Sequence, residues 1–462
     1  MQLARRSVRG AEVAALAVVL GLAAVLRGVG AGSGLPLPLL NPDETNIVPR
    51  AWDLVHGGGL DPGWYDYPSF LFLLLAPTQI AFDEPSYGAA RVVAVLIGLV
   101  GVAAAWWLGR ASYGSLAGVT GAVGVAVATT HVAYSRMAVT DVLLTLGVTV
   151  TLALLVTGRL EWAGVAAGLA ASAKYPGIVL LVPLVVAAWG AWRRLGIAVG
   201  LAAAAFFVTS PFVVLHARTA WDDVDRVQGL AQDGWLGFEH DPATPFAFAD
   251  RLWETIGPVV LVAAAGLVLA LIRRTRSDLV LCAFLVAYAV SLAPVEAHFD
   301  RYVLPFVPVA AVLAGRASFL VPVALGAMVV PLWWSVEDAR SLTGTDPRLD
   351  ASAWVERTVP SGDRVAADPS TLPLRGHDVL RLALPGPGRP FDARRNLAVL
   401  RANGARWLVV SGAVTDRVLA AADSYPREAA FYRSLERLTP AYATPAQPGR
   451  RDRPWLRVYR LP

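Results

Sequence analysis

The sequence predicts a mostly α-helical membrane protein, in which a bundle of about 11 transmembrane helices precedes a small α/β domain. Three observations predict this fold. Hydrophobic residues make up 56% of the 462 residues and charged residues only 16%, whereas soluble proteins contain roughly 25% charged residues. Long apolar runs recur up to residue 335. From residue 336 onward, Arg, Asp, Pro and Gly become frequent instead. A cytosolic enzyme, a secreted soluble domain and a disordered chain are therefore excluded.

The basic residues indicate membrane orientation and not nucleic-acid binding. The net charge is +5 and comes almost wholly from arginine, because Lys174 is the only lysine. Basic residues in a membrane protein mostly mark cytoplasmic loops. A nucleic-acid partner would need a clustered basic face, which this sequence lacks. Cys282 is the only cysteine, so neither a disulfide within the chain nor a cysteine–histidine zinc site is expected.

The first apolar run, 11–27, is predicted to be a retained transmembrane helix. Arg5, Arg6 and Arg9 precede it, and no cleavage site followed by a soluble domain comes after it. The positive-inside rule then puts the N-terminus in the cytoplasm and residues 28–89 outside. Within this first outer loop, residues 69–82 are apolar but short and contain Pro77. We expect them to lie at the membrane interface.

The positions of the later spans are predicted from the arginines between them, because two segments on the same side of the membrane must be separated by an even number of crossings. Arg159 and Arg193 both favour the cytoplasm, so residues 163–192 must cross an even number of times. We expect two short helices there, broken at Lys174–Gly177, because proline and glycine interrupt helices. The other spans are predicted at 90–108, 115–131, 141–157, 196–216, 255–272, 278–294, 303–315 and 318–335.

Residues 336–462 are predicted to form the α/β domain, separate from the membrane domain at 1–335. They contain no apolar run long enough to span a bilayer, and parity places them outside. Short apolar stretches alternate with helical patterns, which is typical of a small α/β fold. The expected strands are Arg364–Ala367, Val379–Leu384 and Trp407–Ser411, and the expected helices are Asp350–Thr358, Asp392–Asn403 and Thr415–Asp423.

Two polar groups lie in the first outer loop. Asn41-Pro42-Asp43-Glu44 follows the first span directly. Such a carboxylate pair can act as a general base or bind a cation, but it can equally be a solvated loop whose Asp begins a helix. Tyr65-Asp66-Tyr67-Pro68 precedes the short apolar segment, and its structural explanation is an interfacial aromatic turn.

Three further groups are placed on the same outer side. Arg136 runs against the positive-inside rule, and Asp141, at the start of a span, can cap that helix or take part in chemistry. Lys174 lies at the predicted helix break. A charge inside the membrane is energetically costly, so this lysine suggests a functional role unless its ammonium reaches the membrane interface. Arg301 stands among the acidic residues of 296–302, where a salt-bridged turn is the structural alternative. The second outer loop, 217–254, adds His240.

Together these residues resemble the C-type glycosyltransferases, in the branch of the protein O-mannosyltransferases and aminoarabinose transferases. The resemblance rests on Asp43-Glu44, Tyr67-Pro68, the Arg136–Asp141 turn, Lys174-Tyr175 and the Arg-Tyr-x-Leu-Pro-x-x-Pro element at 301–308. Residues 348–362 also resemble the start of the outer domain in bacterial members. The likeness covers roughly residues 1–360. Ser69 stands where many members have a second proline, and the region around His240 matches loosely.

The resemblance implies a polyprenyl-phosphate-linked sugar as donor and a lipid, polysaccharide or protein as acceptor. Phosphate is a good leaving group, so its developing charge needs cations, for which Lys174, Arg301 and Arg136 are the candidates. The acceptor hydroxyl needs a general base, for which we choose Asp43, with Glu44 and Asp141 orienting the acceptor or a cation. The expected substrate-binding residues are Tyr67, Arg136, Lys174, Tyr175, His240 and Arg301.

Family members differ in metal use, so a divalent cation is an open expectation, with Asp43, Glu44 and Asp141 as its ligands. Attack opposite the leaving group inverts the anomeric carbon, by analogy with inverting glycosidases.

The alternative function is a transporter or flippase, which shares the span count and the intramembrane charge. Transporters often contain paired broken helices in two repeated halves, but this sequence has one clear break. We expect a multi-pass protein of the plasma or inner membrane, with its site and C-terminal domain outside the cytoplasm.

Overall fold

The computed structural model describes residues 2–371, 374, 376–445 and 453–461. The chain divides into two compact units. The first unit comprises residues 1–228, 243–294 and 298–343, and the second comprises residues 229–242, 295–297 and 344–462. Two short pieces from the loops of the helical part thus belong to the second unit.

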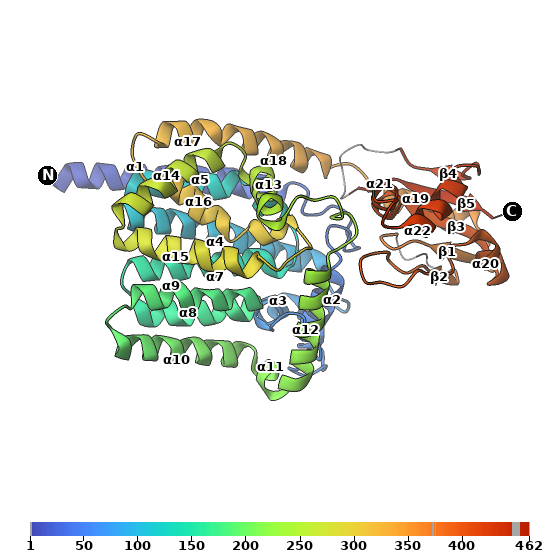
Figure 1. Ribbon diagram of the computed structural model, residues 1–462, viewed down its shortest axis with the longest axis horizontal. Coiled ribbons are helices and arrows are strands. Elements are labelled where there is room, and N and C mark those ends of the chain that lie inside the picture. The colour runs from blue at the N-terminus through green and yellow to red at the C-terminus, as the bar shows by residue number, and fades with distance from the viewer. Residues whose placement is uncertain (1, 372–373, 375, 446–452, 462) are drawn as a thin grey trace. The chain divides into compact units, whose positions relative to one another are not determined.

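The first unit is helical, and its long helices α4, α7, α8 and α10 run side by side (Figure 1). Helix α12 (Ala217–Asp233) begins in this unit and ends in the second. The other helices are α1 (Gln2–Gly28), α2 (Glu44–Asp53), α3 (Phe70–Gln79), α4 (Tyr87–Tyr113), α5 (Ser115–Val127), α6 (Thr129–Tyr134), α7 (Thr140–Val156), α8 (Leu160–Ala173), α9 (Leu181–Ala187), α10 (Trp192–Thr209), α11 (Pro211–Leu215), α13 (Thr244–Ile256), α14 (Val259–Arg273), α15 (Arg276–Leu292), α16 (Phe306–Ala314), α17 (Val321–Ala327) and α18 (Val329–Ser341), with 3₁₀ turns η1 (Tyr175–Leu180) and η2 (Asp300–Val303).

Proline and glycine divide several of the expected spans into shorter helices. The break at Lys174 is confirmed, because α8 ends at Ala173 and η1 follows it with Pro176 in its first turn. Helices α13 and α14 meet at 114°, where Gly257 adopts a φ of 56° that other residues rarely take and Pro258 follows. These breaks are local consequences of the sequence, since neither residue type continues a helix well.

In the described part of the chain, three helices are long and apolar enough to cross a bilayer by length and composition: Gly10–Gly28, Tyr87–Tyr113 and Trp192–Thr209. Counting the bent pair α13–α14 as one span raises the number to four. Shorter apolar helices, such as α5 and α7, supply the rest of the bundle. The expected eleven crossings depend on these short helices as well, and that number stays a prediction.

Helices α8 and α10 approach each other more closely than side chains would allow. Gly164 and Gly168 lie one turn apart on α8, and a Cβ atom at either would overlap a backbone carbonyl oxygen of α10, at Ala198 or Ala202. Small residues spaced four apart permit this backbone contact between membrane helices.

The second unit is built on a five-stranded mixed sheet in the order β2-β1-β3-β5-β4. Strand β1 pairs in parallel with β2 and β3, whereas β5 is antiparallel to β3 and β4. Its elements are α19 (Pro347–Thr358), β1 (Arg364–Ala367), β2 (Val379–Arg381), α20 (Leu397–Ala402), β3 (Ala405–Ser411), α21 (Gly412–Ala420), α22 (Pro426–Leu435), β4 (Tyr442–Ala443) and β5 (Leu456–Arg460).

Strand β3 has apolar cores on both faces, because successive side chains of a strand point to opposite sides. Leu408 and Val410 pack with α21 and α22, whereas Trp407 and Val409 pack with α19. The three strands expected from the sequence are present. The structure also contains two strands, β4 and β5, and one helix, α22, that were not expected.

Candidate active site

Helix α2 begins between Asp43 and Glu44, and the two neighbouring carboxylates lie in different environments. Glu44 is its first residue and is fully buried. Asp43 is the residue before the helix, but its side chain does not cap the helix. The structural explanation of Asp43 as a capping residue therefore does not hold, and its carboxylate is available for other contacts.

The Glu44 carboxylate forms a buried ion pair with Arg91 of α4. It accepts hydrogen bonds from Arg91 Nε at 2.9 Å and Nη2 at 2.7 Å, and from the backbone N–H of Ala138 at 3.0 Å. Arg91 also donates to the carbonyl oxygens of Ala31 and Ser33. Glu44 thus joins the first loop to α4 and to the turn before α7, and both of its oxygens are occupied.

The Asp43 carboxylate lies between a phenol and a guanidinium. Its Oδ2 accepts a hydrogen bond from Tyr67 Oη at 3.0 Å and lies 3.5 Å from Arg301 Nη1. The side chain of Asp43 is 23% exposed, in contrast to that of Glu44. Burial and the nearby Asp43 carboxylate raise the pKa of Tyr67 well above its usual value, so the phenol keeps its proton and acts as the donor.

A buried pair, Asp141 and Lys174, belongs to the same cluster. Asp141 lies in the first turn of α7, and Lys174 is the residue directly after α8. Lys174 Nζ donates to Asp141 Oδ1 at 2.6 Å and lies 5.5 Å and 5.4 Å from the ring centres of Tyr67 and Tyr302. Asp141 Oδ2 is buried and has no hydrogen-bond partner among the described residues.

Arg301 lies in η2 and supplies the second cation of the cluster. Its guanidinium is 4.6 Å from the ring centre of Phe299, and its Nε is buried with no hydrogen-bond partner in the described part of the chain. The neighbouring Asp300 accepts a hydrogen bond from Tyr134 Oη at 2.9 Å. Burial raises the pKa of Asp300, against the opposing effects of Tyr134 and Arg301. Because Arg301 Nε has no partner among the described residues, this atom can donate a hydrogen bond to a further ligand.

The structure brings five of the nine expected site residues into this one cluster: Asp43, Tyr67, Asp141, Lys174 and Arg301. Glu44 lies next to it in sequence but is committed to Arg91. Tyr175 supports the first loop, because its Oη donates to the carbonyl oxygen of Tyr65 at 2.7 Å.

Arg136 and His240 have other partners. Arg136 is fully buried, where it donates to the carbonyl oxygen of Leu26 and pairs with Asp338 of α18. His240 belongs to the second unit, where its Nε2 lies 3.6 Å from Asp423 Oδ1. The expected binding roles of these two residues stay predictions.

Arg91, Tyr134 and Tyr302 were not among the predicted site residues. Arg91 carries the clearest signal, because it is a lone arginine at the start of a long apolar run and needs an acidic partner when buried. Tyr134 and Tyr302 stand next to polar residues that were selected, but nothing in the local sequence distinguishes their rings from interfacial aromatics.

The carboxylates expected to bind a divalent cation are Asp43, Glu44 and Asp141. Among the described residues, no group of three or more His, Cys, Asp or Glu side chains could hold a metal ion. Glu44, Asp43 and Asp141 are each paired with a cation of the chain, namely Arg91, Arg301 and Lys174. Hard divalent cations need several converging oxygens, and the expected cation at these residues stays a prediction.

Solved structures of two other proteins share the fold of this chain. ArnT from Cupriavidus metallidurans in the apo state is 18% identical, with 98% of each chain covered and a TM-score of 0.61. The same protein bound to undecaprenyl phosphate gives 18% identity, 97% and 98% coverage, and a TM-score of 0.59.

The archaeal oligosaccharyltransferase AglB from Archaeoglobus fulgidus, in complex with an inhibitory peptide and a dolichol-phosphate, is 13% identical. That alignment covers 91% of this chain and 71% of AglB, with a TM-score of 0.57. No curated protein sequence matches the chain. The sequence model of glycosyltransferase family 87 matches residues 64–295, which is half of the chain, and the protein belongs to this family. The resemblance inferred from the sequence is confirmed, and family membership favours a membrane glycosyltransferase over a transporter.

Proposed function

We propose that this glycosyltransferase moves a sugar from a polyprenyl-phosphate donor to an acceptor hydroxyl, by a single inverting displacement. Two of the structures with the same fold contain undecaprenyl phosphate and a dolichol-phosphate, which supports a lipid-phosphate donor here. The acceptor is a lipid, a polysaccharide or a protein. One AglB structure is tethered to an acceptor peptide.

The observation that carries the proposal is the environment of Asp43. Its Oδ2 is held by Tyr67 and Arg301, whereas Oδ1 receives no side-chain hydrogen bond from the described residues. The side chain is partly exposed. A carboxylate fixed through one oxygen and open at the other is suited to accept a proton from an incoming hydroxyl group. We therefore assign the general base to Asp43.

The displacement itself needs one proton acceptor and charge stabilisation. The acceptor oxygen forms a bond to the anomeric carbon as its proton passes to Asp43, and the bond from that carbon to the phosphate oxygen breaks. The bonding electrons leave with the lipid phosphate. We assign the binding of this phosphate to Lys174 and to Arg301, whose buried Nε has no hydrogen-bond partner among the described residues. Asp141 holds the Lys174 ammonium in position.

We propose that the reaction proceeds without a metal at these residues, because each of the three expected ligands is paired with a cation of the chain. We further propose that the chain is a multi-pass protein of the plasma or inner membrane with about 11 crossings. The cluster and the C-terminal unit then face the outside. The arginines at the cytoplasmic ends of the expected spans support this orientation.

A deletion strain complemented with variants tests the proposal. Without the protein, a polyprenyl-phosphate sugar should accumulate in lipid extracts, and a glycan that carries this sugar should be lost. Asp43→Asn keeps the shape of the side chain but removes its basicity, so turnover should fall at least about 100-fold with donor binding largely kept. Asp83→Asn, an exposed position of the same loop, is the matched control.

Three outcomes would contradict parts of the proposal. Normal lipids in the deletion strain would refute the donor class. Near-normal turnover of Asp43→Asn would assign the general base to another carboxylate. Asp141 would be the first candidate, because its Oδ2 has no hydrogen-bond partner among the described residues. Lost activity after thorough metal removal, restored by a divalent cation, would refute the metal-independent mechanism.

A further inference from the structure

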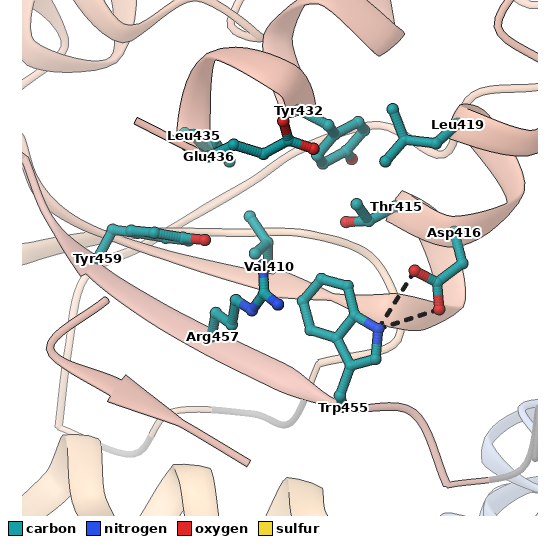
Figure 2. A pocket seen from close by; sticks show the side chains of 10 residues that line it. All are labelled: Val410, Thr415, Asp416, Leu419, Tyr432, Leu435, Glu436, Trp455, Arg457 and Tyr459. Atoms are coloured by element: carbon teal, nitrogen blue, oxygen red, sulfur yellow. Dashed lines mark hydrogen bonds between the residues drawn. The ribbon is translucent and has the colours of Figure 1, made fainter. Parts of the chain in front are cut away.

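The second unit contains a pocket of its own, between helices α21 and α22 and strands β3 and β5 (Figure 2). Its volume is about 210 Å³, which is below the roughly 300–1,000 Å³ of sites for drug-sized ligands. A single ring of sugar size fits this volume. All of its lining residues belong to the second unit, so its existence is independent of the cluster around Asp43.

Aromatic side chains form the walls of this pocket. Trp455 and Tyr459 lie on one side and Tyr432 on the other (Figure 2). Trp455 is fixed in place: its Nε1 donates to both carboxylate oxygens of Asp416 at 3.2 Å and 3.0 Å, and it packs so closely on Gly412 that any side chain there would overlap its ring. A rigid aromatic wall offers apolar area to a ligand at little conformational cost.

Polar groups complete the pocket. Thr415 is buried, and its hydroxyl has no hydrogen-bond partner among the described residues, although a buried hydroxyl normally has one. Figure 2 shows this hydroxyl turned into the space between Tyr432 and Trp455. The carboxylates of Asp416 and Glu436 and the guanidinium of Arg457 also line the pocket.

We infer that this pocket is a saccharide-binding site, which takes one neutral sugar ring of a glycan. The apolar face of a sugar suits the aromatic walls, and its hydroxyl groups suit carboxylates, a guanidinium and the unpaired hydroxyl of Thr415. Two carboxylates against one guanidinium disfavour an anion such as phosphate. The inference goes beyond transfer chemistry, because it assigns to the second unit a site that holds glycan in the absence of a lipid donor.

Ligand-observed NMR on the full-length protein in detergent tests the inference. The probes are the methyl pyranosides of mannose, glucose and galactose and the methyl furanoside of arabinose, with inorganic phosphate as the anionic comparison. At least one glycoside should bind with a dissociation constant in the millimolar range, and phosphate should not compete with it. Binding by none of the glycosides, or displacement by phosphate, overturns the inference.

The decisive variant is Thr415→Val, which removes one hydroxyl without changing the shape of the side chain. If the hydroxyl binds the sugar, affinity should fall about five- to tenfold, and Thr415→Ser should restore most of it. The melting temperature of Thr415→Val should not fall, because the hydroxyl has no partner among the described residues. Thr439→Val, at an exposed position of the same unit, is the matched control. Unchanged affinity in Thr415→Val would place any observed binding elsewhere and overturn the inference.

Discussion

Removing the charge of Glu44 should destabilise the fold, although its neighbour Asp43 is the proposed catalytic base. The perturbation is Glu44→Gln, which keeps the shape of the side chain. The parent carboxylate accepts three hydrogen bonds, two from Arg91 and one from the backbone of Ala138. Glu44 is fully buried and Arg91 is 1% exposed. The substitution therefore leaves a buried guanidinium without its counter-charge.

Breaking a buried ion pair by removing one partner costs roughly 3–5 kcal/mol. Thermal unfolding of the purified protein in a fixed detergent should therefore show a melting temperature lower by on the order of 5 °C or more. The double variant Glu44→Gln/Arg91→Met should lose less than the sum of the two single variants, because it no longer buries an unpaired charge. Glu84→Gln, exposed in the same loop, should change the stability by less than about 0.5 kcal/mol.

Two results would refute the stabilising role of the Glu44–Arg91 pair. If Glu44→Gln melts like the parent protein but loses turnover in the complementation assay, the carboxylate acts on substrate and the ion pair contributes little to the fold. Additive effects of Glu44→Gln and Arg91→Met on stability would equally show that the two side chains are not coupled. Either outcome would return Glu44 to the acceptor-orienting role that its sequence position first suggested.

Three further predictions test the donor site, the orientation and the second unit. Lys174→Met should weaken binding of undecaprenyl phosphate in detergent by roughly 1.5–3 kcal/mol, and Lys174→Arg should restore only part of it; parent-like affinity in Lys174→Met would leave the phosphate to Arg301. A cysteine at Ser361, in a Cys282→Ser background, should react with an impermeant reagent on intact cells, whereas labelling only after permeabilisation would reverse the proposed orientation. Burial raises the pKa of Asp368 to about 6 against the opposing effects of Arg395 and Tyr432, so the folded state binds the extra proton and stability should fall by about 2 kcal/mol as the pH rises from 4 to 6. Asp368→Asn should remove that slope in pH-dependent melting, and an unchanged slope would assign it to other groups.

Local chemistry made much of this fold predictable. Proline and glycine after Lys174 predicted the helix break, and apolar stretches predicted β1 and β3. Strand β5 carries a similar signal, because three of its five residues, Leu456, Val458 and Tyr459, are apolar or aromatic. The strand is short and lies among the arginines of the C-terminal region, so it was not predicted. Helix α22 also has a recognisable start, with Pro426 in its first turn.

The sequence predicted several members of the cluster but not how they pair. The order of the expected spans put Asp43, Asp141, Lys174 and Arg301 on one side of the membrane, and that orientation stays a prediction. Which acid meets which cation did not follow, because Asp43 and Arg301 lie far apart in sequence and only packing of the helices brings them together. The different environments of Asp43 and Glu44 likewise depend on where α2 begins, and helix boundaries are the least certain part of a sequence-based prediction.

The glycine contact between α8 and α10 has a mechanical consequence. Two helices whose backbones touch at successive turns cannot slide or rotate past each other without a steric clash, so they can move only as one body. Lys174 directly follows α8, so the position of its backbone depends on this body. Any movement that makes room within the helical unit must then come from elements outside this pair.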